Sequence, residues 1–158
     1  MTDIDPELLE RLRHSGLRLD REGRWWHEGQ LVEHARLAQA LHRWLDRLED
    51  GRHVVRLDER QYAYVEVEDA PYVVRSLSLA DDGDVRLLLS DDSEEALDPA
   101  SLRVRAGNVL YCAVKGGRFE ARLSRPAYYT LAGQVEEDGE GFVLALGGRR
   151  WPIVSGSR

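Results

Sequence analysis

The stretch from Arg60 to Leu77 carries the longest extended pattern in the chain and constrains the fold most. Its first half reads RQYAYVEVE, so tyrosine and glutamate alternate with alanine and valine. This period of two, rich in aromatic and β-branched residues, predicts a strand with one dry and one wet face. Glu68-Asp69-Ala70-Pro71 then interrupts the pattern, because proline lacks an N–H and forces the preceding residue into an extended conformation. We therefore predict a corner at Pro71 and a new strand from Tyr72.

The composition is that of a globular protein with a sizeable core. The chain has 158 residues, of which 42% are hydrophobic and 32% are charged, and the charges are scattered. No apolar run approaches the roughly 18 residues of a membrane helix, and the acidic N-terminal residues lack the apolar region of a signal peptide. We expect a cytoplasmic protein that does not bind membranes. Cys112 is the single cysteine, and its strand-like surroundings predict a small core residue.

The charge is unevenly distributed along the chain. The formal net charge is −7, yet residues 103–158 contain eight Arg and Lys115 against five acidic residues, a balance of +4. An acidic protein is unsuited to non-specific nucleic-acid binding. The basic C-terminal part either holds a phosphate or complements the acidic remainder of the chain.

A helix and a hairpin are expected in the first 29 residues. Asp5-Pro6-Glu7 is typical of a helix start, and Gly16 of its left-handed end. Leu17 to Gly29 predicts a hairpin that turns at Arg21-Glu22-Gly23.

The main helix is predicted from Leu31 to Glu49, where apolar residues recur at helical spacing. Leu41 and Leu45 lie in the middle of its apolar stripe. His34 and His42 also fall within that stripe. They are either partly buried and hydrogen-bonded or the border of a polar pocket.

The remaining chain predicts short strands separated by turns that contain Gly, Pro or Asp. An acidic loop is expected from Ser90 to Pro99. Strands are expected at residues 52–57, 72–79, 85–89, 109–114, 118–123, 127–135 and 142–146, with a last hairpin at Trp151-Pro152-Ile153.

Two segments share the order strand, turn, strand, proline corner, strand. They run from His53 to Val74 and from Asn108 to Leu131, with Pro71 and Pro126 at the equivalent corners. We therefore predict an α+β fold of two small units related by structural duplication, with antiparallel sheets and one main helix. The expected boundaries are 1–71 for an N-terminal α+β unit and 72–158 for a C-terminal, mostly-β unit.

Four segments resemble the bacterial family catalogued as domain of unknown function 1285. They are GRWWHEG at Gly23–Gly29, DGRHVVRLDE at 50–59, VEDAPY at Val67–Tyr72 and ARLSRPAYYTL at Ala121–Leu131. Where the family shows Thr-Pro-x-Glu, this chain matches only at Glu59. The resemblance implies a duplicated α+β architecture whose second half is similar to pleckstrin-homology-like folds. It also implies a ligand site between the halves, a nucleotide-like ligand and a role in signal transduction, for a family without an established biochemical function.

Trp25-Trp26-His27-Glu28 is the most unusual cluster in the chain. Adjacent residues of a strand face opposite sides, so one tryptophan can enter the core while the other borders a cleft. His27 and Glu28 either contact a polar ligand there or are solvated. Glu66 and Glu68 share a strand face and are either an acid–base pair or a solvated surface.

Basic and aromatic residues interleave near the second proline. Arg118, Arg122 and Arg125, with Tyr128 and Tyr129, either hold a phosphate and stack a base or pair with the acidic half. The complete set of residues predicted to line a ligand site is Trp26, His27, Glu59, Glu68, Arg122 and Arg125.

The sequence contains no catalytic, nucleotide-binding or metal-binding signature. We expect a non-enzymatic module without a cofactor or a metal, which senses a small anionic or nucleotide-like ligand. The alternatives are a protein-interaction module that uses a sheet edge and a hydrolase with Glu68 or His27 as base.

Overall fold

The computed structural model describes residue 14 and residues 16–139 and 141–155. The chain divides into two compact units between Pro71 and Tyr72. It has an α+β fold made mostly of sheet. The helix expected from Asp5 lies outside the described residues. None of the described helices is long and apolar enough to cross a membrane.

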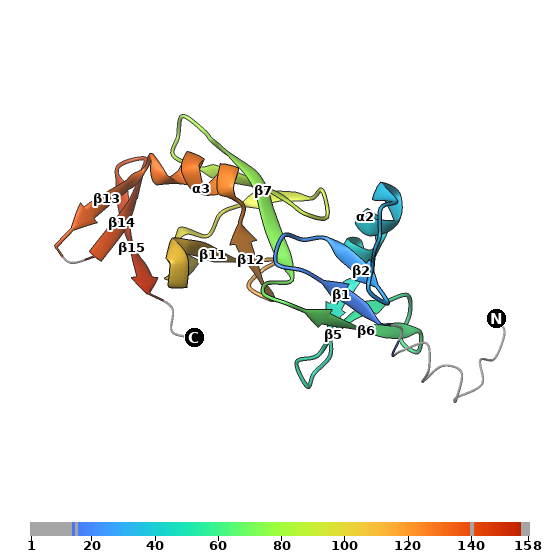
Figure 1. Ribbon diagram of the computed structural model, residues 1–158. Coiled ribbons are helices and arrows are strands. Elements are labelled where there is room, and N and C mark those ends of the chain that lie inside the picture. Colours follow the sequence, from blue (N-terminus) through green and yellow to red (C-terminus); the bar gives the residue numbers. More distant parts are fainter. Residues whose placement is uncertain (1–13, 15, 140, 156–158) are drawn as a thin grey trace. The chain divides into compact units, whose positions relative to one another are not determined.

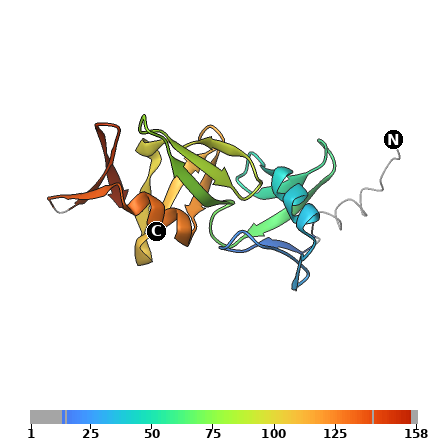
Figure 2. The ribbon, with the colours of Figure 1, turned by 90° about the horizontal axis from the view of Figure 1, so that it is seen from above.

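The first unit is a six-stranded sheet with one helix. The strands lie in the order β3-β2-β1-β6-β5-β4, and β1 runs parallel to β6 whereas the other neighbours are antiparallel. The elements are β1 (Leu17–Leu19), β2 (Trp25–His27), β3 (Gln30–Leu31), α2 (Ala35–Arg43), β4 (Leu45–Arg47), β5 (His53–Arg56) and β6 (Tyr62–Val67). Figure 2 shows α2 lying across strands of this sheet.

The main helix is shorter than predicted, since α2 covers nine residues. Leu31 belongs to β3 and Leu45 to β4. His34 caps the helix by accepting a hydrogen bond from the Leu37 N–H. At the other end Leu45 pairs with Val55 in the sheet. Backbone bonding to β5 therefore replaces further helical turns, and the apolar spacing that suggested a long helix serves two different elements.

His42 joins three parts of the first unit. The indole N–H of Trp25 donates to Nδ1 of His42 at 3.1 Å, and Nε2 lies 2.9 Å from the Pro71 carbonyl oxygen. An indole nitrogen can only donate, so Nδ1 is the acceptor and Nε2 carries the hydrogen given to Pro71. Both rings are buried and meet edge to face. His42 is thus a buried, hydrogen-bonded core residue, which is the first of the two interpretations given above. His34 fits neither interpretation, since it is an exposed helix cap.

The second unit is a nine-stranded mixed sheet in the order β13-β14-β15-β10-β11-β12-β7-β8-β9. Two of its neighbouring pairs, β12 with β7 and β10 with β15, are parallel. Its strands are β7 (Tyr72–Leu79), β8 (Val85–Leu89), β9 (Glu94–Ala96), β10 (Arg103–Arg105), β11 (Val109–Val114), β12 (Phe119–Leu123), β13 (Val135–Asp138), β14 (Gly141–Leu146) and β15 (Arg149–Ser155). The helical elements are η1 (Pro99–Ser101), η2 (Ala106–Asn108) and α3 (Arg125–Ala132). Figure 1 shows α3 beside β7.

The strand expected at residues 127–135 is wrong, because most of this segment forms α3. Ser124 caps the helix: its Oγ accepts from the Ala127 N–H and donates to the Arg75 carbonyl on β7. Pro126 occupies the first turn, where a missing N–H costs nothing. The two proline segments therefore share only an antiparallel hairpin, since Pro71 leads into a strand and Pro126 lies in a helix. The predicted equivalence of the two corners is wrong, and the likeness to pleckstrin-homology folds stays a prediction.

Two glycine turns of the second unit approach one another closely. Gly83, between β7 and β8, has φ +91°, and a Cβ there would lie 2.7 Å from the Cα of Gly147. Gly147 belongs to the turn between β14 and β15. A side chain at either glycine would clash with the other turn, so this close approach of the β14–β15 turn to the β7–β8 turn requires glycine.

We predict that Leu41→Ala lowers the free energy of unfolding by about 2–5 kcal/mol, because the side chain is 8% exposed within the first unit. Leu37 is a matched control: it lies on the same helix but is 46% exposed, and its replacement by alanine should cost less than about 1 kcal/mol. Urea denaturation measures both values. Equal losses would contradict the assignment of Leu41 to the core.

We also predict that His42→Leu destabilises the protein by about 2 kcal/mol or more, because it leaves the Trp25 N–H and the Pro71 carbonyl without a partner. Trp25→Phe removes the donor instead. Because Trp25 and His42 bond to each other, the double variant should lose clearly less free energy of unfolding than the sum of the two single variants. Additive losses in urea denaturation would argue against the coupling.

Candidate ligand site

Two predicted arginines line one cavity in the second unit. The cavity measures about 370 Å³ and includes Arg122 and Arg125. Its other lining residues are Gly107, Asn108, Val109, Leu123, Tyr128 and Tyr129. We call it the arginine cavity.

The passage from β12 into α3 places the two guanidinium groups. Arg122 is paired with Tyr111 of β11 and Val73 of β7, and its neighbours Ala121 and Leu123 are buried. Strand alternation therefore turns Arg122 to the opposite face, where it is half-buried. Arg125 is the first residue of α3 and is exposed. Across residues 14, 16–139 and 141–155, no carboxylate forms an ion pair with Arg125.

A left-handed turn forms another part of the wall. Gly107 and Asn108 have φ values of +77° and +61°. Asparagine is one of the few residues with a side chain that tolerate this conformation. Asn108 was not among the predicted site residues. The dipeptide Gly107-Asn108 between two predicted strands could have indicated this left-handed turn from the sequence.

The side chains around the arginine cavity suit a ligand that has an anionic group and a planar aromatic group. Guanidinium groups grip carboxylates and phosphates with paired hydrogen bonds. The rings of Tyr128 and Tyr129 meet edge to face with centroids 5.6 Å apart. Tyr129 is 67% exposed, so its ring is accessible for stacking.

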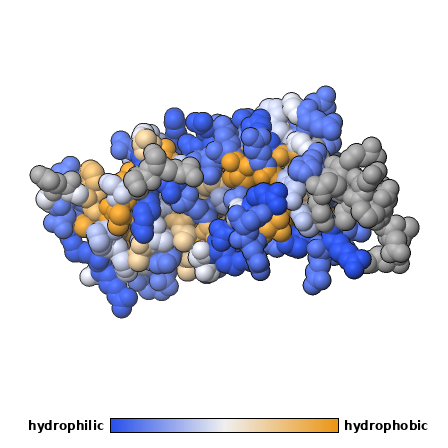
Figure 3. Space-filling model, turned by 90° about the horizontal axis from the view of Figure 1, so that it is seen from below, coloured by the Kyte–Doolittle hydropathy of each residue, from blue (hydrophilic) through white to orange (hydrophobic). Residues whose placement is uncertain are grey.

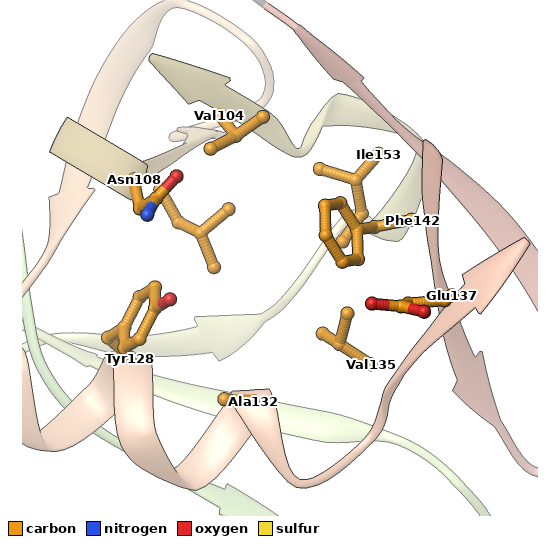
Figure 4. Close-up of a pocket in the computed structure, with 9 residues that line it drawn as sticks. Val104, Asn108, Tyr128, Ala132, Val135, Glu137, Phe142 and Ile153 are labelled. Atoms are coloured by element: carbon orange, nitrogen blue, oxygen red, sulfur yellow. The ribbon is translucent and has the colours of Figure 1, made fainter. Parts of the chain in front are cut away.

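A second cavity, also of about 370 Å³, adjoins the first and is mainly apolar. Asn108 and Tyr128 line both cavities. Figure 4 shows these two side chains on one side of the space and Val135, Glu137, Phe142 and Ile153 on the other. The remaining lining residues are Val104, Leu110 and Ala132. We call it the apolar cavity.

The other predicted site residues belong to the first unit. Trp26 donates from Nε1 to Asp20 at 2.9 Å, and Arg18 lies over its ring. Glu68 accepts from the backbone N–H and the guanidinium of Arg21. His27 and Glu59 are exposed, on β2 and in the turn between β5 and β6. Their convergence with Arg122 and Arg125 stays a prediction.

Asp20 organises the tryptophan cluster. Its carboxylate is buried, which raises the pKa, but hydrogen bonds from Trp26 and from the backbone and side chain of Arg24 outweigh burial, and the pKa lies below its usual value. Trp25 is core and Trp26 is half-buried. Trp26 is thus anchored by a charged acceptor.

The single cysteine is buried and unreactive. Burial raises the pKa of the Cys112 thiol to about 12, so it stays protonated at neutral pH. In the described part of the chain, no group of three His, Cys, Asp or Glu side chains could hold a metal ion.

A third cavity, in the first unit, has His14, Arg18, Tyr64 and Glu66 among its lining residues. Glu66 therefore borders a cavity, although the sequence favoured its neighbour Glu68.

Comparison with known proteins shows which fold this is. No protein-family model matches the sequence, and no curated protein matches it either. The structure is similar to that of a DUF1285 family protein from Silicibacter pomeroyi DSS-3, with a TM-score of 0.74, 17% identity and coverage of 97% of this chain and 90% of the other. It is also similar to a DUF1285 family protein from Shewanella baltica OS155, with a TM-score of 0.62, 17% identity and coverage of 75% and 91%. The resemblance to this family seen in the sequence is thus confirmed at the level of the fold.

We predict that Asp20→Asn lowers stability by about 2 kcal/mol at neutral pH, because an amide nitrogen cannot replace the acceptor of these bonds. The folded-state pKa of Asp20 is depressed, so its contribution is present above the unfolded value and is lost as the pH falls through the folded one. The stability difference between wild type and variant should therefore shrink below about pH 4. Denaturation at several pH values tests this, with the exposed Asp81→Asn as control; a difference independent of pH would contradict it.

Proposed function

We propose that this protein is a non-enzymatic cytoplasmic binding module that takes a small anionic ligand in the arginine cavity. The observation that carries the proposal is the convergence of Arg122 and Arg125 on one cavity. Guanidinium groups keep their charge at any physiological pH, so two of them bordering one hollow favour an anion.

The surroundings of the cavity support an anion in two further ways. The cavity lining contains two arginines and no acidic residue, and such a pair of cations raises the concentration of anions beside it. Arg125 also begins α3, and the positive end of the helix dipole adds to the field. A nucleotide-like ligand would in addition stack on Tyr128 or Tyr129, consistent with the signalling role that the family resemblance implies.

The lining of the arginine cavity favours binding over catalysis. Its residues are Gly, Asn, Val, Arg, Leu and Tyr, and no carboxylate, imidazole or thiol is among them. A hydrolase needs a base within hydrogen-bond reach of the attacking group. Glu68, one base considered from the sequence, is hydrogen-bonded to Arg21 instead.

The alternative, a module that recruits a partner through a sheet edge, has less support. In the described part of the chain the terminal strands β3, β4, β9 and β13 contain two to four residues each. Two of them, β9 and β13, carry acidic side chains: Glu94, Glu95, Glu136, Glu137 and Asp138. Short, charged edges discourage the addition of a further strand.

Binding is tested by a thermal-shift screen and an NMR titration with pyrophosphate, common nucleotides and butyrate. We predict saturable binding that perturbs the amides of Gly107, Asn108 and Tyr128. Arg125→Ala should weaken it about tenfold or more, because a charged hydrogen-bonding partner is lost, and should leave the melting temperature of the free protein nearly unchanged.

Arg86→Ala is the matched control. It removes the same charge from an exposed position of β8 in the same unit, outside both cavities. If Arg86→Ala weakens anion binding as much as Arg125→Ala does, the effect of Arg125→Ala comes from the change in net charge and not from a contact in the cavity. If no anion binds saturably at millimolar concentration, the proposal is refuted. The protein-interaction module is then the favoured function.

A further inference from the structure

The arginine cavity and the apolar cavity are neighbours that share two side chains. Asn108 and Tyr128 line both of them. Asn108 comes from the left-handed turn after β10, and Tyr128 comes from α3. In Figure 4 both lie on the same side of the apolar cavity. A ligand in the arginine cavity therefore needs only to pass these residues to reach apolar surface.

One face of α3 runs along both cavities. Arg125, Tyr128 and Ala132 recur at helical spacing, so they lie on one side of the helix. Arg125 lines the first cavity, Tyr128 both, and Ala132 the second. At 1.5 Å per residue, the distance along α3 from Arg125 to Ala132 is roughly 10 Å. The face changes from cationic to aromatic to small and apolar over that length.

The far wall of the apolar cavity is a row across three strands. Glu137 of β13 lies opposite Phe142 of β14, which lies opposite Ile153 of β15. The cross-strand pair Val104 and Leu110, from β10 and β11, forms another part of the wall. Such a mostly apolar lining with a few polar groups is typical of small-molecule sites.

Apolar surface remains exposed at this row. Phe142 is 50% exposed, although aromatic side chains usually contribute by burial. Figure 3 shows hydrophobic surface at the left of the view, on the side where Figure 1 places β13 to β15. An apolar ligand group in the cavity would cover part of this surface.

We propose that the two cavities form one site for an amphipathic anion with an alkyl chain. The carboxylate or phosphate head binds Arg122 and Arg125, and the chain passes Tyr128 and lies between Ala132 and the row of Glu137, Phe142 and Ile153. This inference rests on the proposed anion site and names its ligand class. A nucleobase fits the apolar cavity less well, because only Asn108, Tyr128 and Glu137 offer side-chain hydrogen bonds there.

Glu137 sets the orientation of the ligand. It is the one acidic residue that lines the apolar cavity, and it is exposed. An anionic head beside it would be repelled, whereas a methyl end would not. The head therefore lies at the arginine end. Glu137→Gln should leave the affinity for alkyl anions unchanged or raise it.

The proposal is tested by isothermal titration calorimetry with butyrate, hexanoate, octanoate and decanoate, each below its micelle-forming concentration. Affinity should rise about two- to fourfold for each added methylene until the cavity is filled. Decyl phosphate compares a phosphate head with a carboxylate head. Decanol and decyltrimethylammonium should bind at least tenfold more weakly than decanoate, because neither has an anionic head for the arginines.

Ala132→Leu separates the two parts of the site. Leucine is a good helix former, and its side chain at this position would occupy the apolar cavity. It should weaken decanoate binding at least tenfold and leave pyrophosphate and butyrate unaffected, whereas Arg125→Ala should weaken all three. Phe142→Ser, which removes apolar wall from a half-exposed position, should flatten the rise of affinity with chain length if Ala132→Leu fails to fold.

The outcomes distinguish this inference from the anion site on which it rests. Anion binding without any dependence on chain length overturns the inference and leaves the anion site standing. Equal binding of decanol and decanoate, or decanoate binding insensitive to both Ala132→Leu and Phe142→Ser, also overturns it. Nucleotides that bind more tightly than every alkyl anion overturn it as well. Absence of any anion binding refutes both proposals.

Discussion

The hydrogen bonds of His42 are the interaction on which the first unit depends. They connect α2 to β2 through Trp25 and to the end of the unit through the Pro71 carbonyl. A nine-residue helix is too short to be stable alone in water, so α2 depends on such contacts. The ring must be neutral, with its hydrogen on Nε2, because the indole N–H occupies Nδ1. One imidazole thus fixes a helix, a strand and the position at which the chain leaves the unit.

Ser124 has the corresponding position in the second unit. Its backbone N–H donates to the Val74 carbonyl, and its hydroxyl donates to the Arg75 carbonyl while it caps α3. The helix is therefore joined to β7 at its first turn. Arg122 precedes this junction by two residues and Arg125 follows it directly. The cap at Ser124 therefore fixes where the backbone of both arginines lies along the wall of the arginine cavity.

Local pairing of charges sets the arginine cavity apart from the negative net charge of the protein. Many carboxylates are engaged locally: Asp20 with Arg24 and Trp26, Asp91 with Lys115, and Glu120 with Arg105. None of the residues lining the arginine cavity is acidic. Local arrangement therefore matters more than net charge, since the field at a cavity is dominated by its nearest groups. The two DUF1285 family structures compared above are 17% identical to the chain, which is too low to carry over the residues that line the cavities.

Features that depend on residues close together in the chain could be predicted from the amino-acid sequence. Alternation and Gly-containing turns located the hairpins β1–β2, β7–β8, β11–β12 and β14–β15. Of the predicted basic and aromatic cluster, Arg122, Arg125, Tyr128 and Tyr129 line one cavity, whereas Arg118 does not and lies over the Phe119 ring. Features that depend on contacts between distant segments became clear only in the folded chain. The parallel pairs β1–β6, β7–β12 and β10–β15 join segments distant in sequence, and local patterns carry no signal for them. Long-range contacts also explain the two wrong predictions of secondary structure. Pairing of Leu45 with β5 ends α2 earlier than predicted, and the hydrogen bond from Ser124 to β7 helps to hold residues 125–132 as a helix instead of a strand. The apolar cavity was not foreseen, because its walls come from seven separate elements that only the folded chain brings together.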